Sequence, residues 1–405
     1  MRVLLSTIGS RGDFQPLLAL GVQLRGLGHE ARLCAPPDFR GLAEEHGLPF
    51  VPLGPGLQPG ATAGPAPKKP TIEELRALVP ATVAGQFETV GEAAGGCDAI
   101  VGCNQLQVAA RSVAELRGIR YFFADYSPVS LPSPQHAPPP LPGRPPADPD
   151  ADDRTRWAQE INRRNAIWRP ALNGQRAAAG LGPVDDVLGH ILTDRPLLAA
   201  DPALAPWPRP SDVDVVQTGA WTLPDRRPLP REVEDFLADG EPPVYFGFGS
   251  MRSPRELGRA AVEAARALGR RAIVLRGWAG LSLPDDGPDC LAVTELNLQA
   301  LFPRVAAVVH HGGAGTTTTA ARGGAPQVVV PHHYDQDYFA RRVQDLGIGV
   351  AHAGAEPTAV SLATALKQVL RSDVESRARS FAAEVRTDGA RVAAELIVAS
   401  VTARP

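Results

Sequence analysis

A stretch that combines apolar residues, histidines and glycines, VVHHGGAGTTTTAARGGAPQVVVP, runs from Val308 to Pro331. Its glycines permit a tight turn from a buried strand into a helix that begins near Ala314–Thr316. The first backbone N–H groups of such a helix have no partner inside it, and together with the helix dipole they form an anion site. The pattern therefore predicts that this segment binds phosphate.

Side chains in the same turn carry suitable donors. His311 can donate an imidazole N–H to a phosphate oxygen, and Thr316 and Thr317 add hydroxyl groups at the same helix end. The alternative is a glycine-rich turn with a capping threonine and a core histidine, which is a common arrangement. The segment is not a P-loop, because GxxxxGK[ST] is absent. The candidate anion-binding residues are His311, Gly312, Gly313, Gly315 and Thr316.

The turn STIGSRGDFQP, near the N-terminus, is a second candidate. Asp13 precedes a helix whose early proline, Pro16, suits a first turn, so helix capping is one explanation for it. An aspartate at the carboxyl edge of an open α/β sheet can also take a proton from a bound hydroxyl. The turn lacks GxGxxG, and LCAPP ends the second strand without an acidic residue, which counts against a dehydrogenase.

Two further stretches follow expected strands of the second half. FGFGS ends in Ser250, close to the expected phosphate turn. In HHYDQDYFA, Asp335 and Gln336 could accept hydrogen bonds from vicinal hydroxyls. His332 and His333 are adjacent, and adjacent residues rarely bind the same metal ion. No third ligand stands at a recognisable spacing, so we expect no metal.

The elements that must position these residues alternate between short apolar runs and helical patterns in both halves of the chain. This alternation predicts an α/β fold with parallel sheets, and 405 residues exceed the usual size of one core. We expect two Rossmann-like domains that face each other across a cleft. The expected boundaries are an N-terminal domain over 1–211, a linker over 212–230, a C-terminal domain over 231–388 and a last helix over 389–405 that crosses back to the first domain.

Composition excludes several classes of protein. A formal net charge of −3 gives no electrostatic footprint for nucleic acid. The longest apolar runs fall far short of the roughly 20 residues that cross a bilayer, and the N-terminal run is too short for a signal peptide. The four cysteines show no metal spacing. These features favour a cytoplasmic enzyme without an integral membrane segment.

Five motifs in this order resemble those of the GT-B glycosyltransferases that decorate natural products: GSRGD, GFGS, RGW, HHGGAGT and DQ. The similarity is greatest to the vancomycin-group glycopeptide glycosyltransferases, through RVLLSTIGSRGD, LCAPPD, RSVAE, LLAADPALAP and VQTGAW. The resemblance covers essentially the whole chain. It implies an inverting, metal-independent transfer of a hexose from a TDP- or UDP-sugar to a hydroxyl of an aglycone, without a cofactor.

The same resemblance assigns roles by position. Asp13 would be the general base that activates the acceptor, and the first domain would bind that acceptor. The turn from Gly312 to Thr317 and His311 would hold the donor diphosphate, with help from Ser10 and Ser250. The remaining donor contacts would be Arg276 and Trp278 at the nucleoside and Asp335 and Gln336 at the sugar.

Substrate identity is less determined. A glycopeptide antibiotic scaffold is the expected acceptor, with a polyketide or other aromatic aglycone as the alternative. A nucleotide-sugar epimerase of the same fold, or a binding protein that has kept it, are alternatives from other classes. The segment ELNLQALFPR lacks the proline–glutamine pair of wider members of the family, so the base preference stays open. Loops 54–70 and 127–150 should face the acceptor, and we expect a monomer or weak dimer.

Overall fold

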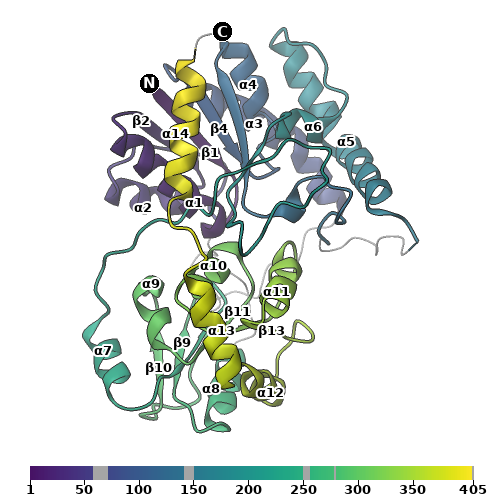
Figure 1. The fold of residues 1–405 in the computed structure, drawn as a ribbon. Helices are drawn as coiled ribbons and strands as arrows, with labels where there is room; N and C mark the ends of the chain where they lie inside the picture. The colour runs from purple at the N-terminus through teal and green to yellow at the C-terminus, as the bar shows by residue number, and fades with distance from the viewer. Residues whose placement is uncertain (58–71, 141–149, 250–255, 278–279, 404–405) are drawn as a thin grey trace.

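The computed structural model describes residues 1–57, 72–140, 150–249, 256–277 and 280–403. They form two lobes, each built on a parallel sheet flanked by helices (Figure 1). The strand order is β3-β2-β1-β4-β5-β6-β7 in the first sheet and β10-β9-β8-β11-β12-β13 in the second. In each sheet the first strand of the lobe lies inside the sheet: the next two strands extend the sheet on one side of it, and the later strands extend it on the other side, as in Rossmann folds. These orders confirm the expected two-lobed α/β architecture.

The first lobe contains two helices that the sequence does not predict, α5 and α6, which follow loop 127–150. Its strands are β1 (Arg2–Thr7), β2 (Glu30–Ala35), β3 (Phe50–Pro52), β4 (Ala99–Cys103), β5 (Arg120–Asp125), β6 (Leu197–Leu198) and β7 (Val216–Gln217). Its helices are α1 (Arg11–Gly26), α2 (Arg40–Glu45), α3 (Ile72–Ala93), α4 (Ala110–Arg117), α5 (Asp153–Ala178) and α6 (Val187–Leu192), with short 3-10 turns at 37–39 and 128–130.

The second lobe repeats this organisation. Its strands are β8 (Val244–Gly247), β9 (Ala272–Leu275), β10 (Cys290–Val293), β11 (Ala307–His310), β12 (Gln327–Val329) and β13 (Gly349–Ala351). Its helices are α7 (Arg231–Ala238), α8 (Leu257–Arg266), α9 (Leu298–Leu301), α10 (Ala314–Arg322), α11 (Gln336–Asp345), α12 (Ala359–Val369) and α13 (Ser372–Ala382), and a 3-10 turn spans 302–304. Among the described helices, none is both long enough and apolar enough to cross a membrane.

The central strands are buried along their length. β4, β8 and β11 are buried at every residue, and β1 at every residue but the first, as expected for parallel strands covered on both faces. Each sheet reverses its winding between two of these strands, β1 and β4 in the first lobe and β8 and β11 in the second. In open α/β sheets, ligands bind outside the carboxyl ends of strands at such a switch point. Both candidate turns of the sequence lie at one.

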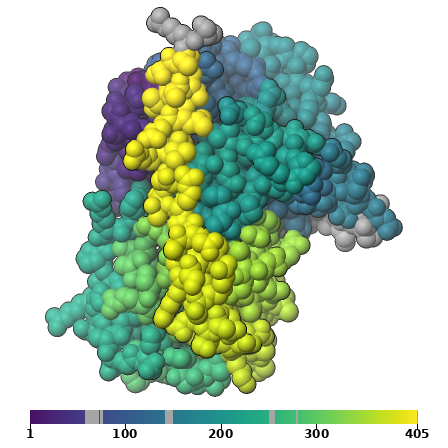
Figure 2. Space-filling model, viewed as in Figure 1, coloured from purple at the N-terminus to yellow at the C-terminus, as the bar shows by residue number. Residues whose placement is uncertain are grey.

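The last helix, α14 (Gly389–Thr402), leaves the second lobe and packs on the first (Figure 1). Its Ala393, Ala394 and Ile397 join the apolar core of α1 and the first sheet. In Figure 2 the yellow C-terminal segment, which is α13 followed by α14, runs along one face of the molecule from the second lobe onto the first. The C-terminal crossing therefore ties the two lobes together with buried apolar surface.

The boundary between the lobes differs from the expected linker in one respect. β7 lies inside 212–230 yet pairs with β6 as the edge strand of the first sheet, so the connection begins after Gln217. A two-residue strand is too short to produce a periodic signal in the sequence. Elsewhere the lobes touch directly, because Leu204 packs in one cluster with Phe339, and Arg342 donates from Nε to the Leu204 carbonyl at 2.9 Å.

Candidate active site

The first-lobe site is the turn that joins β1 to α1. Ser10 is the N-cap of α1, and its hydroxyl accepts a hydrogen bond from the Gly12 amide. In return Asp13 Oδ2 accepts from the Ser10 amide at 2.8 Å and from the Ser10 hydroxyl at 3.3 Å. This reciprocal pair is a capping box, so Asp13 does cap the helix, from its third position. One carboxylate oxygen is thereby committed to the turn.

The other oxygen of Asp13 lies toward β4. Asn104, one residue beyond that strand, donates from Nδ2 to Asp13 Oδ1 at 3.2 Å. Burial raises the pKa of Asp13 above its ordinary value, and the hydrogen bonds from Asn104 and Ser10 oppose that rise. The Tyr126 hydroxyl donates to the Asp13 carbonyl at 2.8 Å and fixes the first turn of α1. A carboxylate in this setting can act as a proton acceptor.

The second-lobe site is the turn between β11 and α10. Helix α10 begins at Ala314, within the predicted range of Ala314–Thr316, and its N-cap, Gly313, supplies no side-chain cap for the first amides. Gly312 has a φ of 92°, and a Cβ there would lie 2.7 Å from Val329 Cγ1, so the turn requires glycine. The uncapped amides at the start of α10 are available to an anion.

His310, which the sequence analysis did not single out, builds this turn. The ring is fully buried, accepts from the Gly312 amide at Nδ1 (3.1 Å) and donates from Nε2 to Gln327 Oε1 (2.9 Å). These two bonds define the tautomer and attach the turn to β12. Burial lowers the pKa of His310 to about 4, so the ring is neutral. Its role in this structure is positional.

His311, unlike His310, has a ring nitrogen that no protein group contacts by a hydrogen bond within the described residues. This nitrogen, Nδ1, is buried. Burial, followed by the nearby His310, His332 and His333, lowers the pKa of His311 to about 3, which makes the ring neutral at physiological pH. Buried polar atoms normally have partners, so an unpartnered imidazole nitrogen beside free helix amides is a feature expected of a ligand site.

The threonines of α10 divide into two kinds. Thr317 was expected to offer its hydroxyl to an anion, but that hydroxyl donates to the Gly313 carbonyl at 2.9 Å. Thr318 and Thr319 bond in the same way to the carbonyls one turn earlier. Such bonds are a common use of threonine inside a helix. Thr316 lies in the first turn and is partly exposed, together with the more exposed Gly315.

A second turn, after β8, lies against the first. A Cβ on Gly249 would come within 3.2 Å of the His311 ring, and one on Gly277 would come within 2.5 Å of the Gly249 carbonyl oxygen. The end of β8, the end of β9 and the His311 turn are therefore in contact. Arg276, exposed at the end of β9, lies beside this group. The expected contacts Ser250 and Trp278 lie outside the described residues.

Asp335 and Gln336 stand at the start of α11. The Gln336 side chain is buried, and its Oε1 accepts from the backbone amides of His332 (2.9 Å) and His333 (3.3 Å), which shapes the loop after β12. Tyr334 in that loop is exposed and has a φ of 60°. Gln336 thus orders the segment that presents Asp335.

Three carboxylates influence one another electrostatically across the boundary between the lobes. Burial, then the carboxylate of Asp125, raises the pKa of Asp335 to about 7, and Asp13 adds to the rise. Asp125, at the end of β5, has a pKa raised to about 6 by burial. The structure therefore brings Asp335 of the second lobe near both first-lobe carboxylates. Asp125 was not among the residues expected from the sequence.

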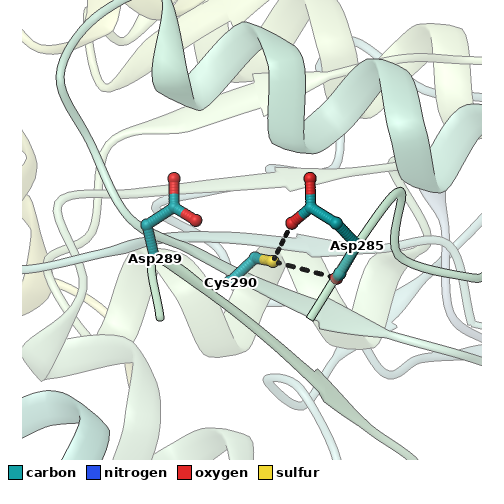
Figure 3. A group of neighbouring side chains, drawn as sticks. All are labelled: Asp285, Asp289 and Cys290. Carbon is teal, nitrogen blue, oxygen red and sulfur yellow. Dashed lines mark hydrogen bonds between the residues drawn. The ribbon is translucent and has the colours of Figure 1, made fainter. Parts of the chain in front are cut away.

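One other cluster has the composition of a cation site but lies apart from these turns. Asp285, Asp289 and Cys290 lie together in the second lobe (Figure 3). The guanidinium of Arg266 already bonds both carboxylates at 2.7–2.8 Å and lowers their pKa values. This group is an ion-pair network with its own cation.

Comparison with known proteins fits this geometry. Residues 3–131 match the glycosyltransferase family 28 N-terminal domain, and residues 279–399 match the erythromycin biosynthesis protein CIII-like C-terminal domain. The fold resembles a crystal structure of the glycosyltransferase of kitacinnamycin, with a TM-score of 0.74 at 20% identity over 98% of both chains. It also resembles the glycosyltransferase VinC in complex with dTDP, with a TM-score of 0.65 at 20% identity over 99% of both chains.

Curated relatives are much more similar in sequence. Glycosyltransferase GtfE of Amycolatopsis orientalis is 53% identical over 405 residues, which cover 99% of this chain and 98% of that protein. The vancomycin aglycone glucosyltransferase of the same organism is 50% identical over 407 residues, with 99% and 98% covered. Its dTDP-epi-vancosaminyltransferase is 45% identical over 386 residues, with 93% and 92% covered.

Two facing Rossmann-like lobes give the protein the GT-B fold, and the relatives at about 50% identity make it a glycosyltransferase. Within that class, the chain belongs to the glycosyltransferase family that contains the vancomycin-group enzymes of Amycolatopsis orientalis.

Proposed function

We propose that the protein transfers a hexose from a TDP- or UDP-sugar to a hydroxyl of a glycopeptide antibiotic aglycone, with inversion and without a metal ion. The acceptor oxygen attacks the anomeric carbon and loses its proton to Asp13. The bond from that carbon to the β-phosphate oxygen breaks, and its electron pair remains on the nucleoside diphosphate. The named activities of the relatives support this assignment.

The observation that carries the donor half is the unpartnered His311 nitrogen beside the uncapped start of α10. Negative charge develops on the departing diphosphate, and fixed amides and a neutral imidazole N–H can stabilise it in place of a cation. Ser10, Ser250 and Thr316 would add hydroxyl contacts, and Arg276 and Trp278 would contact the nucleoside. Glycosyltransferase VinC, of the same fold, was solved in complex with dTDP.

The acceptor half depends on the first lobe. Asp13 can take the proton because one of its oxygens has only the Asn104 bond among the described residues. Leu106, in the loop after β4, is an exposed apolar side chain whose backbone amide bonds Asn104, and an apolar surface there suits a largely apolar aglycone. Asp335, which faces Asp13, would bind hydroxyls of the donor sugar, and Gln336 would hold its loop in place.

Asp13→Asn tests the proposal. The amide keeps an oxygen for the Ser10 amide, so the capping box survives, while the proton acceptor is lost. We expect kcat to fall by roughly 10²- to 10⁴-fold, the usual effect of losing a general base, with TDP affinity unchanged by calorimetry. Ser361→Ala is a control for any loss of capping, because it removes the third-position side chain from the capping box of α12, which is not part of the proposed site. Parent-like turnover in Asp13→Asn would refute the proposed mechanism.

The acceptor and donor are identified by mass spectrometry. Purified protein is offered TDP- and UDP-hexoses together with glycopeptide and polyketide aglycones. A product of aglycone plus one hexose is expected with the glycopeptide. A product with the polyketide alone would move the acceptor to another class, and conversion of the nucleotide sugar without any acceptor would indicate an epimerase.

A further inference from the structure

Asn104, at the switch point of the first lobe, has an unusual backbone conformation. Its φ is 60°, in the left-handed region that L-residues rarely adopt, although asparagine enters it more readily than most. Strained residues of this kind gather at functional sites. The residue directly follows β4. Because glycine would adopt this conformation without strain, an asparagine here indicates that its side chain is needed.

The side-chain amide joins three groups. Nδ2 donates to the Ile8 carbonyl, in the turn after β1, and to Asp13 Oδ1 at 3.2 Å. Oδ1 accepts from the Leu106 amide at 2.8 Å, in the loop after β4. One amide thus connects the two loops of the switch point and contacts the carboxylate between them.

Ser10 and Gly9 bound the side of the Asp13 carboxylate opposite Asn104. Ser10 bonds Oδ2, and a Cβ on Gly9 would lie 2.3 Å from that oxygen, so the carboxylate fits only over a glycine. Asn104 is the described residue that contacts the oxygen on the other side. Together these contacts restrict the orientation of the carboxylate.

We propose that Asn104 is a positioning residue that orients the Asp13 carboxylate for proton transfer, an inference that rests on the proposed role of Asp13. Asparagine combines the two properties needed. It tolerates the left-handed conformation, and it has both an acceptor for Leu106 and a donor for the carboxylate. Glycine would lack the amide, and aspartate would lack the donor. The Asn104 donor also favours the ionised form of Asp13, which is the form able to accept a proton.

Asn104→Asp is the informative variant. Aspartate tolerates the same backbone conformation and keeps an oxygen for the Leu106 amide, but it places a carboxylate beside Asp13. Like charges at this distance raise a carboxyl pKa, so the acid limb of kcat/KM against pH should move up by about one unit or more. Cys103, Asp125, Tyr126 and Asp335 also face Asp13 and are unchanged in this variant.

A second variant, Asn104→Gly, relaxes the backbone and removes the amide. We expect its acid limb to move in the same direction, because the hydrogen bond that lowers the Asp13 pKa is lost. TDP affinity, measured by calorimetry, should stay within about twofold of the parent in both variants, since neither touches the expected diphosphate turn. If Asn104→Asp does not fold, Asn104→Gly still decides the question.

The results separate this inference from the proposed function. If Asp13→Asn loses turnover while both Asn104 variants keep the parent pH profile, the Asn104 inference is wrong and the role of Asp13 stands. An equal loss of TDP affinity and turnover would show a merely structural residue and would also overturn the inference. If Asp13→Asn keeps parent turnover, the proposed function itself fails, whatever the Asn104 variants do.

Discussion

The adjacent histidines at the end of β11 should respond to substitution in opposite ways. His310 makes two buried hydrogen bonds within the protein, whereas the buried Nδ1 of His311 makes none among the described residues. His310→Ala should therefore destabilise the fold. His311→Ala should leave stability nearly unchanged and weaken the binding of nucleoside diphosphate.

The structure sets the size of each effect. His310→Ala leaves the Gly312 amide and Gln327 Oε1 without their partners, and an unsatisfied buried group costs about 1–3 kcal/mol, so the loss is about 2–6 kcal/mol. In a lobe of this size each kcal/mol lowers Tm by about 2–4 °C. For His311, one hydrogen bond to a charged ligand contributes about 1.5–3 kcal/mol, which corresponds to roughly 10- to 150-fold in Kd.

The assay pairs thermal unfolding with calorimetric titration of TDP. His311→Gln is the matched control, because its amide restores a donor at the same turn, and it should recover part of the lost affinity. Equal TDP affinity in His311→Ala and the parent would refute the proposed phosphate contact. A loss of Tm as large in His311→Ala as in His310→Ala would refute the division of roles between the two rings.

Two further expectations follow from charges near the lobe boundary. Because the folded-state pKa of Asp335 is raised to about 7, the folded protein keeps a proton that the unfolded chain loses near pH 4, so stability should fall as pH rises through this range. Asp335→Asn should flatten that part of a plot of unfolding free energy against pH, and an unchanged slope would contradict the raised pKa. The ion pair between Arg11 and Glu295 joins the lobes at 2.8 Å, but both side chains are over 40% exposed. Glu295→Gln should therefore cost at most about 1 kcal/mol, less at high salt, and a larger loss in chemical denaturation would show that this contact holds the lobes together.

Local sequence determined much of this protein. Alternating strand and helix patterns predicted two parallel α/β lobes, and the glycines after His311 predicted a helix start within Ala314–Thr316, where α10 does begin. These features are local, since a tight turn needs glycine and a parallel strand needs a continuous apolar run whatever surrounds them. The motif order likewise indicated the glycosyltransferase family that the comparisons show.

Tertiary structure decided which neighbours complete the site. Asn104 is 91 residues from Asp13, and the two meet only because β4 pairs with β1. Asp125 and Asp335 lie in different lobes, so their mutual effect on pKa depends on how the lobes pack. His310 and His311 are chemically identical in the sequence, and alternation along β11 buries one against Gln327 while the other sits in the turn. Contacts between distant segments depend on chain topology, for which a single sequence carries no local signal.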